Sequence, residues 1–168
     1  EEKKNICNIK MTLKKDLTLV MIINENKNQV LLGMKKRGFG CGRWNGFGGK
    51  VIENESIEEC AIRETFEECG LTIEIFNKIG NIIFEFDNDP VLLNVHVFRC
   101  DCYSGVITES DEMHPQWFNY SDIPFDQMWP DDYLWYPHLL KNEKFKGYFL
   151  FEGHDKIIKE EVQLVDDI

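Results

Sequence analysis

Short runs of apolar and β-branched residues alternate with polar stretches along this chain, a pattern typical of strands joined by turns. The runs at residues 18–23 and 29–34 are separated by polar residues and predict a β-hairpin. The runs at 81–86 and 91–99 flank a stretch of Asp, Asn and Pro at 87–90 and predict a second hairpin.

A helix is predicted between these two hairpins. Ser56 and Glu59 have the spacing of a capping box, and Gly70 is the residue type that ends many helices. The stretch 38–49 before it contains too much glycine for regular structure.

The last third of the chain predicts one more helix and three strands. A strand at 116–119 is followed by a turn at Ile123-Pro124. Pro130 suits the first turn of a helix, and Pro137 is predicted to interrupt or restart that helix. The two closing strands are predicted at residues 148–151 and 157–165.

No internal repeat or linker divides the chain. We therefore predict one α+β domain, with a mixed β-sheet sandwiched between helices, over residues 17–168. Residues 1–16 are predicted to form a polar, Lys-rich N-terminal tail, without the apolar stretch of a signal peptide.

Composition and charge exclude several classes of protein. The chain has 168 residues, of which 43% are hydrophobic and 29% charged, which is typical of a globular domain. Its 19 Lys and Arg against 30 Asp and Glu give a net charge of −11. Binding a nucleic-acid backbone needs a basic surface, so this charge argues against a nucleic-acid-binding protein. No apolar run approaches the roughly 18 residues of a membrane span. The six cysteines form no C-x-x-C pair, so reduced thiols in an intracellular compartment are expected.

The predicted helix carries carboxylates where its core-facing side should be apolar. At roughly 100° per residue, Glu64 and Glu68 continue the stripe begun by Ile57 and Ala61, with Glu67 close beside it. Such neighbouring carboxylates repel by about 0.2–0.5 kcal/mol per pair. A solvated acidic face is the alternative, but the position on the core-side stripe favours a cation site. Hard oxygen ligands suit Mg²⁺ or Mn²⁺.

The spacing around these glutamates resembles the Nudix box. Gly49, five residues, Glu55, seven residues and then Arg63-Glu64-x-x-Glu67-Glu68-x-Gly70-Leu71 match its fixed positions. One position departs: Thr65 stands where the family usually has a bulky aliphatic residue, which predicts poorer packing of the helix on the sheet. The resemblance implies the Nudix fold.

The resemblance also implies roles for the matching residues. Glu64, Glu67 and Glu68 would be metal ligands and catalytic groups, with Arg63 orienting the carboxylates. The carbonyl of Gly48 would complete the metal site. Glu112 is the best match for a further carboxylate from a later loop, although its surroundings alone suggest a solvated acidic turn. The implied cofactor is Mg²⁺, with Mn²⁺ as a substitute.

The glycine-rich stretch is not one of two common phosphate-binding loops. Trp44 stands where a Walker A loop has its first Gly, and Val51 replaces the Ser or Thr after Lys50. No G-x-G-x-x-G lies between a strand and a helix. The segment 44–49 instead offers a flexible backbone, a stacking surface and the amide of Asn45, which can both donate and accept hydrogen bonds.

Further segments are similar to those Nudix hydrolases that act on oxidised purine nucleoside triphosphates. They are VLLGMKKRGFGCGRWNGFGGK (30–50), FEF (84–86), ESDEM (109–113) and MWPDD (128–132), and the likeness runs from Leu17 onward. It implies a nucleotide pocket formed by Thr18, Lys35, Phe39, Asn45, Phe47, Gly48, Gly49, Lys50, Phe84, Trp129, Pro130, Asp131 and Asp132.

The chemistry of these residue types suits a purine. Trp129 and Phe84 can sandwich a base by stacking. Of the adjacent carboxyls Asp131 and Asp132, one kept protonated by burial can donate a hydrogen bond while the other accepts. The alternative is that this pair simply caps the helix after Pro130.

The sequence therefore predicts metal-assisted hydrolysis of oxidised purine nucleoside triphosphates, such as 8-oxo-dGTP and 2-hydroxy-dATP. The resemblance places the attack at the β-phosphorus, giving nucleoside monophosphate and diphosphate and removing damaged precursors. The alternatives are a Nudix hydrolase of another nucleoside diphosphate derivative and a non-catalytic nucleotide-binding module. We expect a monomer with a small-molecule nucleotide as partner, no nucleic acid and no membrane. The expected location is the cytoplasm, with the nucleus and mitochondria left open.

Overall fold

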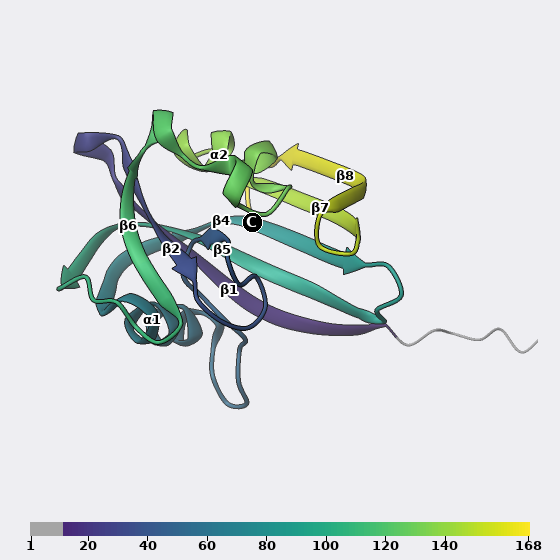
Figure 1. Cartoon of the computed structure of the whole chain (residues 1–168), viewed down its shortest axis with the longest axis horizontal. Helices are drawn as coiled ribbons and strands as arrows, with labels where there is room; N and C mark the ends of the chain where they lie inside the picture. The colour runs from purple at the N-terminus through teal and green to yellow at the C-terminus, as the bar shows by residue number, and fades with distance from the viewer. Residues whose placement is uncertain (1–11) are drawn as a thin grey trace, which may run out of the picture.

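One eight-stranded mixed sheet forms the centre of the computed structural model, which describes residues 12–168 (Figure 1). The strand order is β3-β2-β1-β5-β4-β7-β8, and β6 also pairs with β2. The strands are β1 (Leu13–Asn24), β2 (Gln29–Lys35), β3 (Trp44–Asn45), β4 (Leu71–Phe86), β5 (Val91–Gly105), β6 (Met113–Asn119), β7 (Phe145–Glu152) and β8 (Lys156–Leu164).

The pairing mixes parallel and antiparallel neighbours. β1 runs parallel to β5, and β4 runs parallel to β7. The pairs β1–β2, β4–β5 and β7–β8 are antiparallel hairpins. Both hairpins predicted in the first hundred residues are therefore confirmed, as are the strand after Glu112 and the two closing strands.

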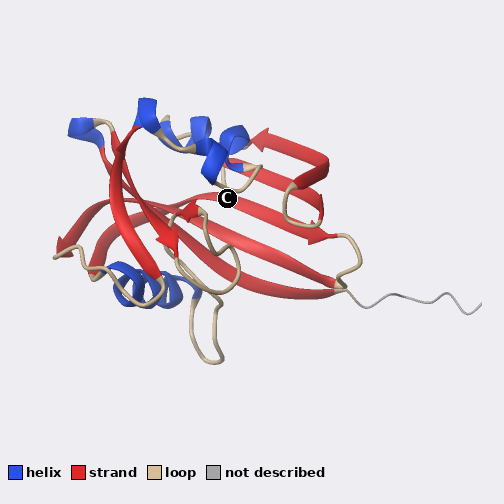
Figure 2. Ribbon diagram, in the orientation of Figure 1, coloured by secondary structure: helices blue, strands red, loops and turns tan. Residues whose placement is uncertain are grey.

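The two α-helices cover opposite faces of the sheet (Figure 2). They are α1 (Ile57–Cys69) and α2 (Asp132–Leu140), and three short 3-10 helices are η1 (Glu25–Lys27), η2 (Tyr120–Asp122) and η3 (Phe125–Gln127). Successive side chains of a strand point to opposite faces. Val20 of β1 accordingly packs in the core on the α1 side, whereas Met21 packs in the core on the α2 side. The predicted sandwich of a mixed sheet between helices is confirmed.

Helix α1 begins and ends where the sequence predicts. The Ser56 hydroxyl accepts from the Glu59 N–H at 3.1 Å, and the Glu59 carboxylate accepts from the Ser56 N–H at 2.7 Å. Gly70 ends the helix with φ at 78°, the left-handed region that favours glycine. Thr65 is fully buried, and its hydroxyl donates to the Ala61 carbonyl at 2.7 Å, so the departure from the Nudix box leaves no unpaired hydroxyl.

Two predicted boundaries and one predicted break differ from the structure. β1 begins at Leu13, inside the segment predicted as a tail, while residues 1–11 of that tail lie outside the described residues. β4 begins at Leu71 and is much longer than the predicted run 81–86. Pro137 was predicted to interrupt or restart the last helix, and this is wrong, because α2 runs through it. Proline has no N–H to donate to the carbonyl four residues earlier in the helix. Pro137 is exposed, so water can bind that carbonyl instead.

Two further features of the described residues concern membrane-spanning helices and the cysteines. Among residues 12–168, no helix is both long and apolar enough to cross a membrane. The five cysteines in the described part of the chain are all free thiols. Three of them are buried, and burial raises the pKa of the Cys69 and Cys100 thiols to about 11.

Candidate active site

Arg63 is the hub of the carboxylate cluster on α1. Its guanidinium donates to the Glu55 carboxylate at 2.6 and 3.0 Å and to Glu64 at 2.8 Å. It also reaches Glu67 at 3.3 Å and the Lys50 carbonyl at 3.3 Å. The hydrogen bonds from Arg63 hold the pKa of Glu55 down at about 2. Arg63 therefore contacts three carboxylates of this cluster.

Glu68 is the buried member of the cluster, with only 4% of its side chain exposed. It accepts a hydrogen bond from the Gly48 N–H at 3.2 Å and lies 3.9 Å from the Lys35 ammonium. Burial, with smaller contributions from the neighbouring Glu64 and Glu112, raises the pKa of Glu68 to about 8 against the lowering effects of Lys35 and of the Gly48 N–H. A carboxyl in this setting is stabilised as an anion only when a cation comes close.

Glu112 joins the cluster from the loop between β5 and β6. Its carboxylate lies 3.1 Å from the Lys35 ammonium and 3.4 Å from Arg37. The hydrogen bond from Lys35 lowers the pKa of Glu112. Lys35 therefore lies between Glu68 and Glu112. The segment around Glu112, for which the alternative was a solvated acidic turn, is thus linked through Lys35 to the carboxylates of α1.

Two glycines let the backbone approach these carboxylates. A Cβ at Gly49 would lie 2.5 Å from the Glu64 carboxyl group, and a Cβ at Gly48 would lie 1.9 Å from the Thr18 carbonyl oxygen. The Thr18 backbone leaves no space for a side chain at Gly48, and a side chain at Gly49 would displace the Glu64 carboxylate. Among the described residues, no three side chains of His, Cys, Asp or Glu lie close enough together to enclose a metal ion. The carboxylates are instead held by Arg63 and Lys35.

An aromatic cluster lies at the opposite end of the glycine-rich loop. Phe39 stacks on Trp129, with ring centroids 5.0 Å apart and an interplanar angle of 29°. Phe86 contacts Phe39 edge-on at 5.8 Å, and His154 contacts Trp129 at 5.4 Å. The guanidinium carbon of Arg43 lies 4.2 Å from the centroid of the Trp129 ring.

Asp131 and Asp132 are buried beside this cluster, with 1% and 3% of their surface exposed. Asp131 accepts one hydrogen bond, from the indole N–H of Trp135 at 2.9 Å. Asp131 Oδ1, Asp132 Oδ2 and the Tyr136 hydroxyl are buried and have no hydrogen-bond partner among residues 12–168. Burial raises the pKa of Asp131 to about 6, and burial together with the charge of Asp131 raises the pKa of Asp132 well above its usual value.

The capping alternative for this pair is wrong. Asp131 stands at the N-cap of α2, but its side chain makes no capping hydrogen bond, and its backbone is helical (φ −81°, ψ −22°) rather than extended. Its carboxyl turns instead toward Trp135, one helical turn further on. Buried polar atoms without partners are costly, on the order of 1–3 kcal/mol each, so they mark a place where a ligand can supply the missing bonds.

The other predicted nucleotide-binding residues fall in different places. The Phe84 ring packs on Phe149 at 5.8 Å, and no ring contact between residues 12 and 168 joins it to Trp129. The Phe47 ring is fully buried in the core on the α1 side, so only its backbone can contact a ligand. The side-chain oxygen Oδ1 of Asn45 accepts a hydrogen bond from the Gly46 N–H at 2.8 Å. Thr18 is buried against Cys60, Lys50 is exposed, and Pro130 is half-buried.

The sequence reasoning missed four residues of the aromatic end. Trp135 and Tyr136 follow Asp131 and Asp132 at the i, i+4 spacing that places side chains on one helix face, so that spacing could have identified them. Arg43 and His154 are 111 positions apart in the chain, so no local sequence pattern predicts their contact.

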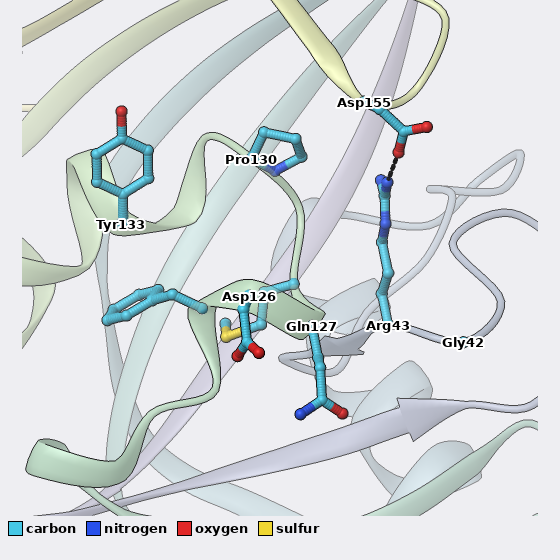
Figure 3. A pocket seen from close by; sticks show the side chains of 9 residues that line it. Gly42, Arg43, Asp126, Gln127, Pro130, Tyr133 and Asp155 are labelled. Atoms are coloured by element: carbon cyan, nitrogen blue, oxygen red, sulfur yellow. Dashed lines mark hydrogen bonds and ion pairs between the residues drawn. The ribbon is translucent and has the colours of Figure 1, made fainter.

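The glycine-rich loop joins the two ends of the site. Phe39, Gly40 and Arg43 contact Trp129, whereas Gly48 and Gly49 contact Glu68 and Glu64. A surface hollow of about 550 Å³ lies beside Arg43 and Pro130 (Figure 3). Trp129, Asp131 and Asp132 do not line it, so the buried unpartnered oxygens of the two Asp residues lie outside this hollow.

Comparison with known proteins adds a family and close relatives. The model of the NUDIX domain matches residues 14–139. A protein of Danio rerio named oxidized purine nucleoside triphosphate hydrolase is 54% identical over 158 residues, which are 94% of this chain and 100% of that protein. A protein of Mus musculus with the same name is 52% identical over 149 residues, which are 89% of this chain and 94% of that protein.

A solved structure shares the fold. The mutator MutT protein of Bacillus halodurans matches with a TM-score of 0.78 over 89% of this chain and 97% of its own, at 23% identity. At that identity the likeness shows the arrangement of sheet and helices alone.

The buried carboxyl pair predicts a stability that depends on pH. Folding raises the pKa of both carboxyls. Such a group stabilises the fold fully below its unfolded pKa, near 3.8, and loses this contribution as the pH rises through its folded pKa. The folded pKa is about 6 for Asp131 and higher for Asp132. We expect Tm to fall from pH 4 to pH 8 in the presence of chelator. Asp132→Asn, which cannot ionise, should flatten this fall and raise Tm at pH 8 by about 2–4 °C for each kcal/mol of relieved burial. The exposed Asp126→Asn is the control, and an Asp132→Asn curve parallel to wild type would contradict the assignment.

Proposed function

The chain belongs to the NUDIX family, and we propose that it hydrolyses oxidised purine nucleoside triphosphates to nucleoside monophosphate and diphosphate. The names of the relatives from Danio rerio and Mus musculus support this substrate. The observation that carries the proposal is the two-ended site. One end of the glycine-rich loop meets aromatic rings and unpartnered carboxyls, and the other end meets the glutamates of α1. A purine attached to a triphosphate has the same two chemical ends.

We propose that the glutamate end holds a divalent metal. NUDIX hydrolases use divalent ions, and Mg²⁺, with Mn²⁺ as a substitute, suits the oxygen donors of Glu64, Glu67, Glu68 and Glu112 together with the carbonyl of Gly48. Burial of Glu68 among other carboxylates supports this fit, because the raised pKa of Glu68 shows that its anion lacks a sufficient counter-charge. When bound, such an ion neutralises phosphate charge and lowers the pKa of a coordinated water.

The chain's own residues bind and orient the triphosphate in this proposal. Arg63 fixes the directions of Glu64 and Glu67, and Glu55 fixes Arg63 in turn. Lys35 is a half-buried cation beside Glu68 and Glu112, and it becomes free to contact phosphate oxygens when a metal takes over those carboxylates. Attack at the β-phosphorus is part of the proposal, by resemblance to the family.

The base is read at the aromatic end. Asp131 and Asp132 each have an unpartnered oxygen, and their raised pKa values favour a state in which one carboxyl is neutral and donates while the other accepts. Such a pair distinguishes an oxidised purine edge from a normal one. These atoms lie beneath the surface, so neighbouring rings must shift when a base enters. Phe39, with 56% of its surface exposed, can move most easily among the rings stacked there.

The remaining parts of the proposal follow from charge and from the chain's size. With a net charge of −11, the partner is a small-molecule nucleotide whose phosphates are bound through a metal, and not a nucleic acid or a membrane surface. We propose that the protein acts as a monomer in the cytoplasm, and also in the nucleus or mitochondria wherever nucleotide precursors are oxidised.

The glutamate end is tested by Glu68→Gln, which removes one negative charge at nearly constant shape. Because losing a metal ligand commonly costs 10- to 100-fold or more, we expect kcat to fall at least about 100-fold while the fold is kept. Glu58→Gln, at an exposed position of the same helix, is the matched control and should keep wild-type activity. Chelator should abolish turnover, and Mg²⁺ should restore it. Full turnover in excess chelator would exclude the proposed metal mechanism.

The aromatic end is tested by Asp131→Asn and Asp132→Asn, each of which fixes one donor and acceptor pattern. A lost buried hydrogen bond costs on the order of 1–3 kcal/mol, so kcat/KM should change by roughly 5- to 150-fold, unequally for 8-oxo-dGTP and 2-hydroxy-dATP. Trp129→Ala should weaken both substrates by a similar factor, because stacking does not read the base edge. A preference ratio that stays constant in both Asp variants would remove this pair from base recognition.

A further inference from the structure

The turn between β7 and β8 contacts the aromatic end of the site, although the proposed function gives it no role. Residues 153–155 form this turn at the tip of the last hairpin, and His154 and Asp155 are exposed. The two residues nevertheless make specific contacts to the glycine-rich loop, more than 100 positions earlier in the chain.

Arg43 makes three contacts that together fix its guanidinium group. One nitrogen, Nη1, donates to the His154 carbonyl at 2.9 Å, and the other, Nη2, pairs with the Asp155 carboxylate (Figure 3). The face of the group lies over Trp129, 4.2 Å from the ring centroid. A guanidinium is planar, so two bonds to one turn fix its orientation over the indole.

The imidazole of His154 is itself part of the aromatic cluster. Its ring centroid lies 5.2 Å from that of Phe39, 5.4 Å from that of Trp129 and 5.6 Å from that of Phe86. The same turn therefore contacts Trp129 directly, through His154, and indirectly, through Arg43.

These contacts are not needed to hold the hairpin in place. β7 and β8 pair along their whole length, from Phe145↔Leu164 to Glu152↔Lys156. The Asp155 side chain is 90% exposed, and surface ion pairs of this kind stabilise proteins little. Their clearest effect is therefore local, on the orientation of Trp129 and on the position of the glycine-rich loop.

We propose that the β7–β8 turn is an outer wall of the base-binding site, that Arg43 is a positioning residue which fixes Trp129, and that Asp155 latches Arg43 in place. The inference rests on the proposed function, because it assumes that Trp129 binds a purine ring. The turn acts on the indole rather than on the edge of the base. It thus sets the affinity for oxidised purines as a class and leaves the choice among them to Asp131 and Asp132.

The test measures binding without catalysis. The probes are 8-oxo-dGMP and 2-hydroxy-dAMP in excess chelator, and calorimetry gives the Kd. Asp155→Asn should weaken both probes by the same factor, about 3- to 10-fold, with Tm within roughly 2 °C of wild type. Arg43→Lys keeps the charge but loses the planar fork, and it should weaken both probes at least as much. In turnover assays, KM should rise while kcat changes less than about 2-fold.

Asp167→Asn is the matched control, because Asp167 is 92% exposed and forms its ion pair with Lys144. Its Kd values should equal those of the wild type. Two results would contradict a role of Asp155 and Arg43 in positioning Trp129 and leave the proposed function intact. One is a wild-type Kd in both Asp155→Asn and Arg43→Lys, and the other is a loss of affinity for only one of the two probes. If the wild-type protein binds neither probe, the proposed function fails and the inference fails with it.

Discussion

Carboxyl groups held inside the fold are the constraint on which the rest of this structure depends. Glu68, Asp131 and Asp132 are each at most 3% exposed. Removing a carboxylate from water is costly unless a cation or several donors surround it, so such a group gains a proton or waits for a ligand. The raised pKa values of all three follow first from burial. The protein thus holds buried carboxyls at two places, and we propose that each place binds a different part of one substrate.

The fold separates these two places and then connects them. The alternation of β1 sends one set of side chains toward α1, which carries Glu68, and the other toward α2, at whose start Asp131 and Asp132 lie. The glycine-rich loop touches both places. Its glycines are needed where its backbone meets Thr18 and Glu64, and its Phe39 and Arg43 are needed where it meets Trp129. A substrate that binds both ends therefore has its reacting phosphates placed by the same loop that contacts its base.

Local signals in the sequence predicted the parts of this arrangement that are made locally. The capping box of Ser56 and Glu59, the end at Gly70 and the carboxylate stripe of α1 all depend on spacings within one helix, and the structure has the helix that they predict. The first half of β4 was missed because Asn77, Lys78 and Gly80 break the apolar run and its pairing with β5 is irregular. Contacts between distant segments, such as Arg43 with His154, have no local signature. The cap predicted as an alternative for Asp131 failed for a different reason, because its carboxyl accepts a hydrogen bond from Trp135, one helical turn further on, instead of capping the helix.

The account as a whole is tested most directly by the turnover of the wild-type protein on oxidised and unmodified purine triphosphates, with the products identified. We propose that an unmodified purine edge matches the two buried carboxyls less well than an oxidised one, and a missing buried hydrogen bond costs on the order of 1–3 kcal/mol. The account predicts kcat/KM for 8-oxo-dGTP and 2-hydroxy-dATP roughly 5- to 150-fold above that for dGTP and dATP, with nucleoside monophosphate and diphosphate as products. Equal kcat/KM for oxidised and unmodified purines, or release of nucleoside diphosphate and single phosphate, would contradict it.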